Sequence, residues 1–440
     1  MEFFYPEQVM NLIETFRICF TKPTYEYFLG YIWALMMAPE RKCMTRLAYI
    51  CFPIQKSLSS WERFLSEYKW NLNKLIEQLI KLLLLQLGKS VLYANKFLIA
   101  VLDTSLIAKA SHKMFGVQKW HDSSSNPDRG ATIKGHHWGI LGILSKWMNR
   151  WLCWPIMLRL ITTEGQWKQG ENGIEPMTFW DLVHSMIYHL QSLINYSLIV
   201  IADAYFSKAP FLNPMIETGV NVISRLRHDS IGWDSPEPKP PGKRGPKPKR
   251  GKQWKLSHLL KELPLQVEKI LLYGKIEEVT YVSRIVWLRE VKEQVRIVVI
   301  KAFIPIILIS TNTDFTPIQI IELYASRFSI EIAIRELKSN FGLCDYQATA
   351  YSAILRFMHL ACVAFCVWRL ALLKSLENQL EWLTLPRQLS YISESPLSFQ
   401  YIRRSLRYWI MRKINYPNSA LLANFNNYSN HDSWLERLIA

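Results

Sequence analysis

Two apolar runs that each end in an aspartate constrain the fold of this chain more than any other feature. KFLIAVLDTS, which begins at Lys96, reaches Asp103, and SLIVIAD, which begins at Ser197, ends in Asp203. Short continuous apolar runs with polar borders predict buried strands. Ligand sites in open α/β sheets lie outside the carboxyl ends of strands, so we expect the two carboxylates to meet at one sheet edge. For either aspartate alone, a turn or a helix cap is the commoner explanation.

The segments around these runs alternate as in an α/β domain. HHWGILGILS and CWPIMLRLI predict two further strands, and a helix is expected around Thr178 to Leu193. The segment SKAPFLNPMIETG predicts a helix that leads into the strand VNVISRL. Residues 1 to about 90 have helical apolar spacing, and so does most of the chain after residue 346. The pattern predicts an α/β core with helical regions at both ends.

Residues 229–312 interrupt this alternation. DSPEPKPPGKRGPKPKRGK cannot pack a core and predicts an extended basic loop, and three strands with hairpin breaks follow it: KIEEVTYVSRIVWLR, QVRIVVIKAF and IPIILIST. Eight cations and no acid lie between Lys239 and Lys255. A linker solvated by its own charge has this composition, but a phosphate-tracking role is favoured. The side chains that the loop offers for it are Lys243, Arg244, Lys247, Lys249 and Arg250.

A later helix carries one polar stripe. Thr316 is a plausible N-cap with Pro317 at the first helical position, and Gly342 ends the pattern, so we expect one long helix. Its residues Tyr324, Arg327, Glu331 and Lys338 are spaced by 3, 4 and 7, which puts them within about 60° of one another. Apolar residues flank the stripe and favour the floor of a polar cleft. A solvated, salt-bridged helix face explains the same spacing, because Arg327 and Glu331 form an i,i+4 pair.

The charge of the chain points to a polyanionic partner. The net charge is +17, and without the eight cations of the loop region it is still +9. Nucleic acid and an anionic membrane surface are the two classes that fit. In the N-terminal region, a DNA-contacting helix pair and a plain structural bundle are equally compatible with a set of cations there: Arg41, Lys42, Arg46, Lys56 and Arg63.

Several other classes are disfavoured. The seven cysteines form no CxxC pair, which indicates a reducing compartment. His359, Cys362 and Cys366 share helical spacing but lie in the apolar stretch FMHLACVAFCVW, so core packing is expected in place of a zinc site. We expect neither a signal peptide nor a transmembrane helix, because the longest charge-free stretch, 182–202, is interrupted by histidine and amide side chains.

Two aspartates at strand ends and a glutamate on a later helix, in a basic chain, indicate a two-metal phosphoryl-transfer site. Mg²⁺ takes oxygen ligands and is typically held by carboxylates together with substrate phosphates. Two such ions about 4 Å apart stabilise both the attacking and the leaving oxygen of an in-line displacement. The sequence thus predicts Asp103, Asp203 and Glu331 as its metal carboxylates.

The same residues carry a family resemblance. The spacing Y-x2-R-x3-E-x6-K from Tyr324 to Lys338 resembles the Y-R-E-K signature of bacterial insertion-sequence transposases of the DDE type. Asp203-Ala204-Tyr205 is similar to the motif around the second aspartate of that family, although Ala204 stands where glycine is common, and Asp103-Thr104-Ser105 is similar to the motif around the first. The resemblance covers roughly residues 40–370. It implies an RNase H-like mixed-sheet core with a β-rich insertion.

The resemblance also implies roles for these residues. Asp103, Asp203 and Glu331 would be the catalytic residues that bind two Mg²⁺ ions, with Mn²⁺ able to substitute, and Tyr324, Arg327 and Lys338 would hold the DNA near the cleaved phosphate. Relatives with this motif nick the element end, form a DNA hairpin, resolve it and join the ends to target DNA. An aromatic residue of the insertion holds a flipped base in such relatives. The residues considered for this role are Trp254 and Trp287, although packing is the commoner role for either.

These inferences divide the chain into five regions and leave alternative functions open. We expect an N-terminal helical region at 1–92, core segments at 93–228 and 313–345, the insertion at 229–312 and a C-terminal helical region at 346–440. The predicted function is a homodimeric, cytoplasmic, nucleoid-associated bacterial transposase that acts on double-stranded DNA at terminal inverted repeats and target sites, with no membrane and no small-molecule substrate. The alternatives are a structure-directed endonuclease with the same core, a catalytically silent DNA-binding relic and, more distantly, a membrane-surface protein.

Overall fold

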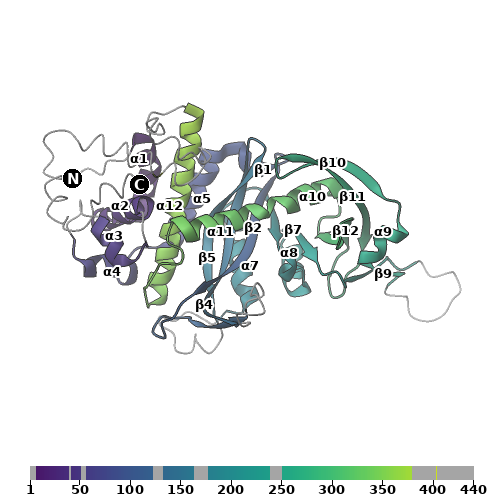
Figure 1. The fold of residues 1–440 in the computed structure, drawn as a ribbon, viewed down its shortest axis with the longest axis horizontal. Helices are drawn as coiled ribbons and strands as arrows, with labels where there is room; N and C mark the ends of the chain where they lie inside the picture. The colour runs from purple at the N-terminus through teal and green to yellow at the C-terminus, as the bar shows by residue number, and fades with distance from the viewer. Residues whose placement is uncertain are drawn as a thin grey trace.

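The computed structural model describes residues 6–38, 41–50, 56–121, 132–162, 177–237 and 250–378, together with Arg403. A large twisted sheet occupies the middle of the molecule, with helices from the two ends of the described chain at one side (Figure 1). The N-terminal region is helical, as predicted. Its elements are α1 (Glu7–Glu14), η1 (Thr15–Cys19), α2 (Lys22–Met37), α3 (Met44–Ile50), α4 (Leu58–Ser66), α5 (Leu72–Leu87) and η2 (Gly88–Val91).

The starts of the N-terminal helices follow ordinary capping rules. The side chain of Ser57 accepts a hydrogen bond from the Ser60 backbone N–H, and the side chain of Asn71 accepts one from Lys74. Each bond satisfies a backbone donor that has no partner within its helix. Fully buried leucines and isoleucines on α5, including Leu75, Leu79 and Ile80, then pack into the core. The caps and the apolar face together explain why the N-terminal helices could be predicted from the sequence pattern alone.

The central sheet has the predicted RNase H-like order. The antiparallel strands β2 (Phe97–Ala108), β4 (Thr132–Trp147) and β5 (Arg150–Ile161) form a meander, and β6 (Ser197–Ala202) and β7 (Asn221–Leu226) add in parallel on the other side of β2. The resulting spatial order is β5-β4-β2-β6-β7. Two short strands were not predicted, β1 (Leu92–Tyr93) beside β2 and β3 (Gln118–His121) beside β4.

The insertion extends the same sheet. Strand β13 (Ile306–Ser310) pairs antiparallel with β7, and β12 (Val295–Ile300), β11 (Lys275–Val286) and β10 (Gln266–Leu272) follow outward, so that eleven strands of the described chain form one sheet. A separate hairpin lies near the basic loop. Its elements and the short helices that follow it are β8 (Ile231–Trp233), β9 (Gln253–Lys255), η5 (Leu256–His258) and α9 (Leu259–Glu262).

Helices cover both faces of this sheet. In Figure 1, α10 (Pro317–Ser326) and α11 (Phe328–Asn340) run across the front of the strands, whereas α7 (Phe179–Ser192) and α8 (Ala209–Glu217) lie behind them. Thr178 forms a capping box with Asp181 at the start of α7, and Thr316 forms one with Gln319 at the start of α10. The predicted N-cap at Thr316 and Pro317 at the first helical position are therefore confirmed.

The single long helix predicted from Pro317 is wrong in one detail, because the structure has two helices that meet at Arg327. The N–H of Arg327 donates to the Tyr324 carbonyl, and the N–H of Ile330 donates to the Arg327 carbonyl, which are bonds over three residues. The hydroxyl groups of Ser326 and Ser329 also bond to carbonyls three residues earlier, in competition with the helical ladder. Arg327 itself keeps helical dihedral angles, so the polar stripe continues across the junction.

The predicted end of the stripe helix at Gly342 is confirmed. This glycine has a φ of +76°, a left-handed conformation that L side chains rarely adopt. The N–H of Leu343 then donates back to the carbonyl of Leu337 and closes α11.

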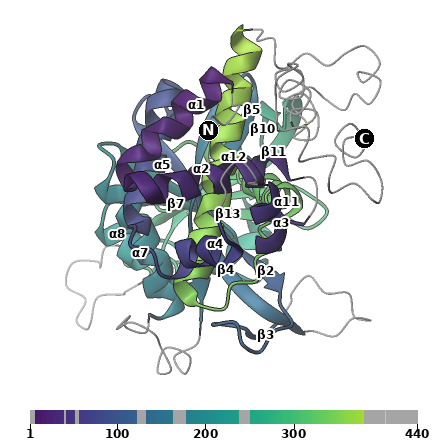
Figure 2. The same ribbon diagram turned by 90° about the vertical axis from the view of Figure 1, so that its left-hand side faces the viewer.

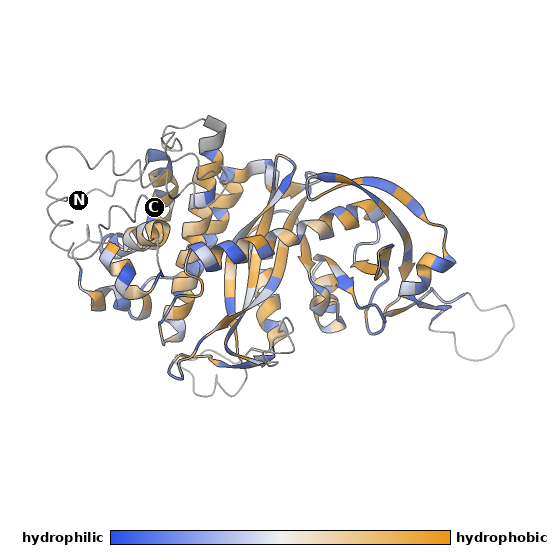
Figure 3. Cartoon of the chain, in the orientation of Figure 1, coloured by the Kyte–Doolittle hydropathy of each residue, from blue (hydrophilic) through white to orange (hydrophobic). Residues whose placement is uncertain are grey.

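The apolar helix α12 (Tyr351–Asn378) is the core helix that the sequence predicted. It packs on β5 on one side and on α1, α2, α4 and α5 on the other, and it crosses the full height of the molecule in Figure 2. In Figure 3 this helix is mostly hydrophobic, whereas α11 carries hydrophilic residues along its length. Tyr351–Lys374 is the one segment of the described chain long and apolar enough to cross a membrane, but 89% of its most apolar window is buried inside the protein, so no membrane span is indicated.

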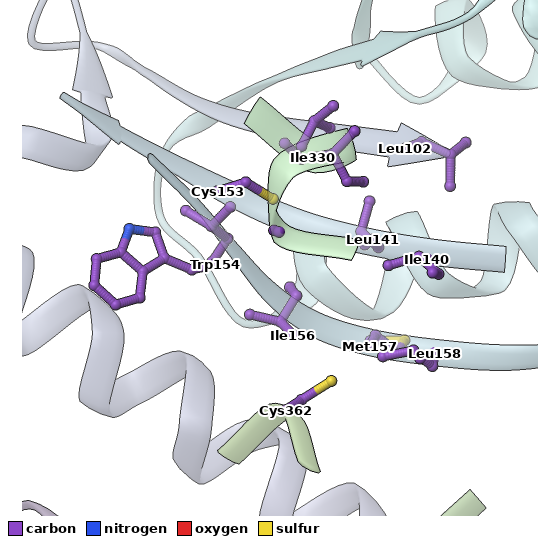
Figure 4. Close-up of a cluster of buried hydrophobic side chains, with 14 of the residues drawn as sticks. Leu102, Ile140, Leu141, Cys153, Trp154, Ile156, Met157, Leu158, Ile330 and Cys362 are labelled. Carbon is purple, nitrogen blue, oxygen red and sulfur yellow. The ribbon is translucent and has the colours of Figure 1, made fainter. Parts of the chain in front are cut away.

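Core packing also explains the His/Cys pattern on α12. The ring of His359 is fully buried, accepts a hydrogen bond from the backbone N–H of Leu158 and lies 2.7 Å from the Leu355 carbonyl. Burial lowers the pKa of this imidazole to about 3. Figure 4 shows Cys362 of α12 in one apolar cluster with Ile330 of α11 and side chains of the central strands. Among the residues that the structure describes, no group of three His, Cys, Asp or Glu side chains is arranged to hold a metal ion.

One of the N-terminal cations is not available to DNA as the sequence had allowed. Lys42 is 2% exposed, and its backbone N–H donates to the carboxylate of Asp345, just after α11. Arg41 lies 3.9 Å from the same carboxylate, so these residues tie the N-terminal helices to the end of α11. The basic segment SFQYIRRSLRYWIMRKI, predicted as an amphipathic helix, lies outside the described residues apart from Arg403.

Candidate active site

Strand register brings the two aspartates to the same edge of the sheet. The last paired residues of the parallel strands β2 and β6 are Leu102 and Ala202, so Asp103 and Asp203 are the next residues in that register. Neighbouring strands lie about 4.8 Å apart, which makes the two side chains neighbours on one face. Asp103 is not at the end of its strand, as the sequence had indicated, because β2 continues to Ala108 by pairing with β4. Asp103 lies instead at the level where the neighbouring parallel strand, β6, ends.

A third residue continues the row. Ile201 of β6 pairs with Ile223 of β7, and this register places Arg225 beside Asp203. Arg225 is exposed, although its neighbours Ser224 and Leu226 are buried. The Ser224 hydroxyl donates to the Asp203 carbonyl at 2.6 Å and so holds β7 against the residue that follows β6. Sequence reasoning missed Arg225; the available signal was a single cation within the apolar strand VNVISRL.

Asp103 lies in a largely buried environment with one cation. Its Oδ1 accepts the backbone N–H of Thr104 at 2.8 Å, and its Oδ2 lies 3.2 Å from Nη1 of Arg327. Burial raises the pKa of this carboxyl to about 6, against the opposing effects of Arg327 and the Thr104 N–H. The carboxylates of Asp203 and Glu331 raise it further, so the three predicted acidic residues act electrostatically on one site.

Asp203 is held by the turn that follows its strand. Its Oδ1 accepts the backbone N–H of Tyr205 at 3.0 Å, which caps the short helix η4 (Ala204–Phe206). Burial raises the pKa of Asp203, whereas the Tyr205 N–H and the guanidinium of Arg327 lower it. The ring of Tyr205 stacks on Trp180 and remains 48% exposed. Asp203 is thus a helix cap, as its position after a strand allows, and at the same time a neighbour of Asp103.

Arg327 lies between a strand carboxylate and a helix carboxylate. While Nη1 contacts Asp103, Nη2 forms an ion pair with Oε1 of Glu331, one turn further along α11. The side chain of Arg327 is 19% exposed and that of Glu331 is 41% exposed. Burial alone lowers the pKa of the guanidinium, but Asp103, Tyr324 and Glu331 more than compensate, and the pKa is raised. The sequence left open whether Arg327 pairs with Glu331, and in this structure it does.

The other two stripe residues face the same strands. Burial raises the pKa of the Tyr324 phenol, which lies within electrostatic range of Arg327, Arg225 and Asp203. Lys338, two turns beyond Glu331, donates from Nζ to the carbonyl of Leu106 on β2 at 3.1 Å. The lysine therefore joins α11 to the strand that carries Asp103. Arg327 and Lys338 thus both contact β2 directly, whereas Glu331 is connected to it through Arg327.

The predicted DNA-contacting residues of the insertion lie elsewhere. Trp254 is 6% exposed, with Lys252 and Arg284 over its ring at 3.8 and 4.2 Å, and Trp287 is half-buried and bridges to Trp233 through backbone hydrogen bonds. The guanidinium of Arg250 lies 4.1 Å from the ring centre of Trp233. The four remaining loop residues, Lys243, Arg244, Lys247 and Lys249, fall outside the described residues.

Three exposed aromatic residues nearer the carboxylates escaped the sequence reasoning. Phe303 is fully exposed in the turn between β12 and β13, and because Ile307 pairs with Leu226 at the end of β7, this turn lies at the edge that carries Asp203. Tyr273, in the turn between β10 and β11, contacts the ring of Phe328, which directly follows Arg327. In the sequence both turns look like ordinary hairpin turns. The local sequence does not show which turns lie at the edge of the sheet that carries the carboxylates.

The donor set fits hard divalent cations. Asp103, Asp203 and Glu331 supply only oxygen ligands, the kind that Mg²⁺ and Mn²⁺ prefer, but in this structure Arg327 lies between Asp103 and Glu331, and the three carboxylates do not form a group that could hold an ion. Burial is the main cause of the raised pKa of Asp103, Asp203 and Glu331 raise it further, and Arg327 offsets part of this increase. A bound cation would lower this pKa as Arg327 does, so the donor types are compatible with a divalent cation.

Comparison with protein families gives two matches. The family described as DDE superfamily endonuclease matches residues 15–269, more than half of the chain, and this range includes Asp103 and Asp203. The family described as Transposase DDE domain matches residues 177–367, which include Asp203 and Glu331. A search of curated proteins finds no match. The mixed sheet, the convergent acidic residues and the longer of the two matches agree, and the chain belongs to the DDE superfamily endonucleases.

Proposed function

We propose that this chain is the transposase of a bacterial insertion sequence with a Y-R-E-K motif, which cleaves the ends of its element and joins them to target DNA. The observation that carries the proposal is the convergence of Asp103, Asp203 and Glu331 from two strands and a helix around Arg327. In a chain with a net charge of +17, such a cluster of acidic residues needs a specific reason, and a site for cations and a polyanion supplies one.

The three carboxylates would hold two Mg²⁺ ions, for which Mn²⁺ can substitute. Such ions stabilise the attacking and leaving oxygens of an in-line displacement at phosphorus. Arg327 neutralises Asp103 and Glu331 in the free protein, and we assign it to a phosphate oxygen of the DNA once cations occupy the carboxylates. Tyr324 and Arg225 lie beside Asp203, where a donor and a cation orient the same phosphate. Lys338 keeps α11 in position against β2.

A hairpin route requires a surface for the base displaced from the end of the duplex. Unstacking that base costs a few kcal/mol, which stacking on an aromatic ring offsets. Trp254 offers little ring area, whereas Phe303 is fully exposed at the edge that carries Asp203. We assign the base-holding role to Phe303 in place of Trp254 and Trp287, and the contacting rings of Tyr273 and Phe328 offer a second exposed aromatic surface.

The partners follow from this activity. The substrate is double-stranded DNA, both the element ends and the target, and the basic loop with Arg250 would follow its phosphate backbone. We propose a homodimer in the complex that holds two element ends, acting in the bacterial cytoplasm at the nucleoid. Neither a membrane nor a small-molecule substrate is part of the proposal.

Nicking of a supercoiled plasmid that carries the DNA flanking this gene tests the proposal. The wild type is expected to nick and then join ends in Mg²⁺ or Mn²⁺, and Asp103→Asn, Asp203→Asn and Glu331→Gln are each expected to lose activity about 10³-fold or more. This magnitude follows because metal stabilisation is worth several kcal/mol and each 1.4 kcal/mol is about tenfold. Asp314→Asn, an exposed carboxylate just before α10, is the matched control. Full activity in any of the three variants would contradict the assignment.

The products distinguish the alternatives. A structure-directed endonuclease with the same core would give nicks and double-strand breaks without joined products. A catalytically silent relic would bind the ends and give no metal-dependent nicking at all.

A further inference from the structure

Two lysines face each other directly across the short ribbon formed by β3 and β4. Lys119 pairs with Lys134 in the antiparallel register of these strands. Residues directly opposite each other hold their Cβ atoms about 5 Å apart on the same face, where like charges destabilise the pair. The Nζ of Lys134 also lies 3.0 Å from one ring nitrogen of His112 and 3.0 Å from the carbonyl of Ala110. The protein alone gains nothing from this repulsion.

The described chain segments on either side of this pair carry no acidic side chain. Residues 104–121 and 132–137 contain no aspartate or glutamate, and Lys119 makes no ion pair among the described residues. Lys113 and His121 are exposed beside the pair. We name β3, its paired residues 132–135 of β4 and Lys113 the lysine ribbon. Opposed lysines on one face of a ribbon suit an anion with several charges at regular spacing.

The lysine ribbon lies on the face of the sheet that carries Asp103. Asp103 pairs with Ile140 and Ala108 pairs with Gly135, so Lys134 is an even number of residues from the partner of Asp103 and points to the same side. Six residues at about 3.3 Å each separate Asp103 from the level of Lys134, which is about 20 Å. In Figure 2, β3 lies at the lower end of the molecule, below β2 and β4.

Buried contacts hold the base of the ribbon against the segment that follows α11. The Nζ of Lys109, just after β2, donates to the carbonyls of Cys344 and Tyr346 and lies 3.6 Å from the centre of the Tyr346 ring. The Tyr346 hydroxyl is 2.6 Å from Nδ1 of His136 on β4. The ribbon therefore has a defined position relative to the helix that carries Glu331.

We propose that the lysine ribbon binds the phosphate backbone of the duplex whose strand enters the carboxylate site, about six base pairs from the phosphate at that site. The distance follows from about 20 Å along β2 and about 3.4 Å for each base pair. The identity of this duplex as the cleaved DNA rests on the proposed function. The binding of DNA phosphates by the lysine ribbon does not depend on the proposed function.

Binding of a random-sequence duplex of about 30 base pairs, in EDTA and over a range of salt concentrations, tests the proposal. The double variant Lys119→Gln/Lys134→Gln is expected to bind more weakly, and the slope of log K against log salt should become shallower by about 1.8 for two lost phosphate contacts. Lys146→Gln, an exposed lysine near the opposite end of β4, should keep the slope of the wild type. Without DNA, the melting temperature of the single variant Lys119→Gln, which leaves the bond from Lys134 to the Ala110 carbonyl in place, should equal or exceed that of the wild type, because the repulsion is gone.

Position and identity have separate readouts. Once the nick is mapped, neutral methylphosphonates about five to seven base pairs from it should weaken binding by the wild type but not by the double variant. An unchanged slope, a lower melting temperature in Lys119→Gln, or an equal effect of methylphosphonates on the wild type and the double variant would overturn the inference. If the wild type fails to nick DNA while the slopes differ as expected, only the proposed function fails.

Discussion

The carboxylates on the strands and the carboxylate on the helix are held by different means. Asp103 and Asp203 stand in adjacent register on parallel strands whose preceding residues are almost all fully buried. Glu331 is 41% exposed and is held through a side-chain ion pair with Arg327. Backbone hydrogen bonds and close packing leave the strand carboxylates little freedom, whereas a partly exposed ion pair can exchange partners. The buried strand carboxylates therefore have raised pKa values, whereas the partly exposed Glu331 can exchange its ion pair with Arg327 for a ligand.

The largest expected difference between the strand carboxylates and Glu331 is in how their ionisation affects the free energy of unfolding. Because the folded-state pKa of Asp103 is about 6 against 3.8, the folded protein holds this proton more tightly than the unfolded chain between those values. Its contribution to the free energy of unfolding therefore falls as pH rises through about 4 to 6, by about 3 kcal/mol in all. Asp103→Asn, which removes the charge, should stabilise the free protein by about that amount at pH 8 and by almost nothing at pH 4.

Urea unfolding of the wild type, Asp103→Asn and Glu331→Gln at both pH values measures the difference. Glu331→Gln should change stability much less, because its carboxylate is partly solvated. A loss of stability in Asp103→Asn at pH 8 would show that the ion pair with Arg327 outweighs burial, and the contrast between the two kinds of carboxylate would disappear.

A smaller effect concerns the cation between the two kinds of carboxylate. Arg327→Met removes the group that lowers the pKa of Asp103, so this pKa should rise above about 6 and the acid limb of the cleavage rate should move to higher pH. Cleavage at pH 7 should fall about tenfold to a hundredfold, as for the loss of one preorganised donor. The deficit should shrink at pH 9, where Asp103 is ionised again.

Arg335→Met, an exposed arginine on α11, provides the matched control for the pH profiles. If the Arg327→Met and wild-type profiles differ only by a constant factor, Arg327 does not set the ionisation of Asp103.

The smallest effect tests the connection between helix and strand. Lys338→Met should lower the free energy of unfolding by about 1 kcal/mol, because the donor to the Leu106 carbonyl is lost while the apolar stem is kept. Hydrogen exchange should also quicken in the last turns of α11 and leave β6 unaffected. Equal protection of α11 in both proteins would indicate that packing of Ile330 and its neighbours alone holds the helix.

The strands with Asp103 and Asp203 could be predicted because each is a short apolar run with a polar end. The start of α10 and the end of α11 could be predicted equally well, since Thr316, Pro317 and Gly342 are ordinary capping residues. The sequence analysis did not predict β10, QVEKILL, in which five of seven residues are exposed. It gave no sign of β3 either, a four-residue strand, QKWH, that pairs with β4.

Within the site, the missed features depend on partners distant in the chain. Arg225 joins the row of aspartates only through the register between β6 and β7. The extension of β2 beyond Asp103 depends on β4, and the break at Arg327 depends on two serine hydroxyls competing for backbone carbonyls. Local patterns predict which residues are polar and on which element they lie, whereas register and tertiary packing decide which of them meet.

The position of α12 makes the catalytic sheet and the N-terminal helices a single folding unit. One side of this helix lies on β5 and the other on four N-terminal elements. Removing the first 90 residues would leave a long apolar surface in water, and a shortened catalytic core would aggregate before it could act. For the same reason, a displacement of the N-terminal helices would be transmitted to β5 through the packed side chains of α12.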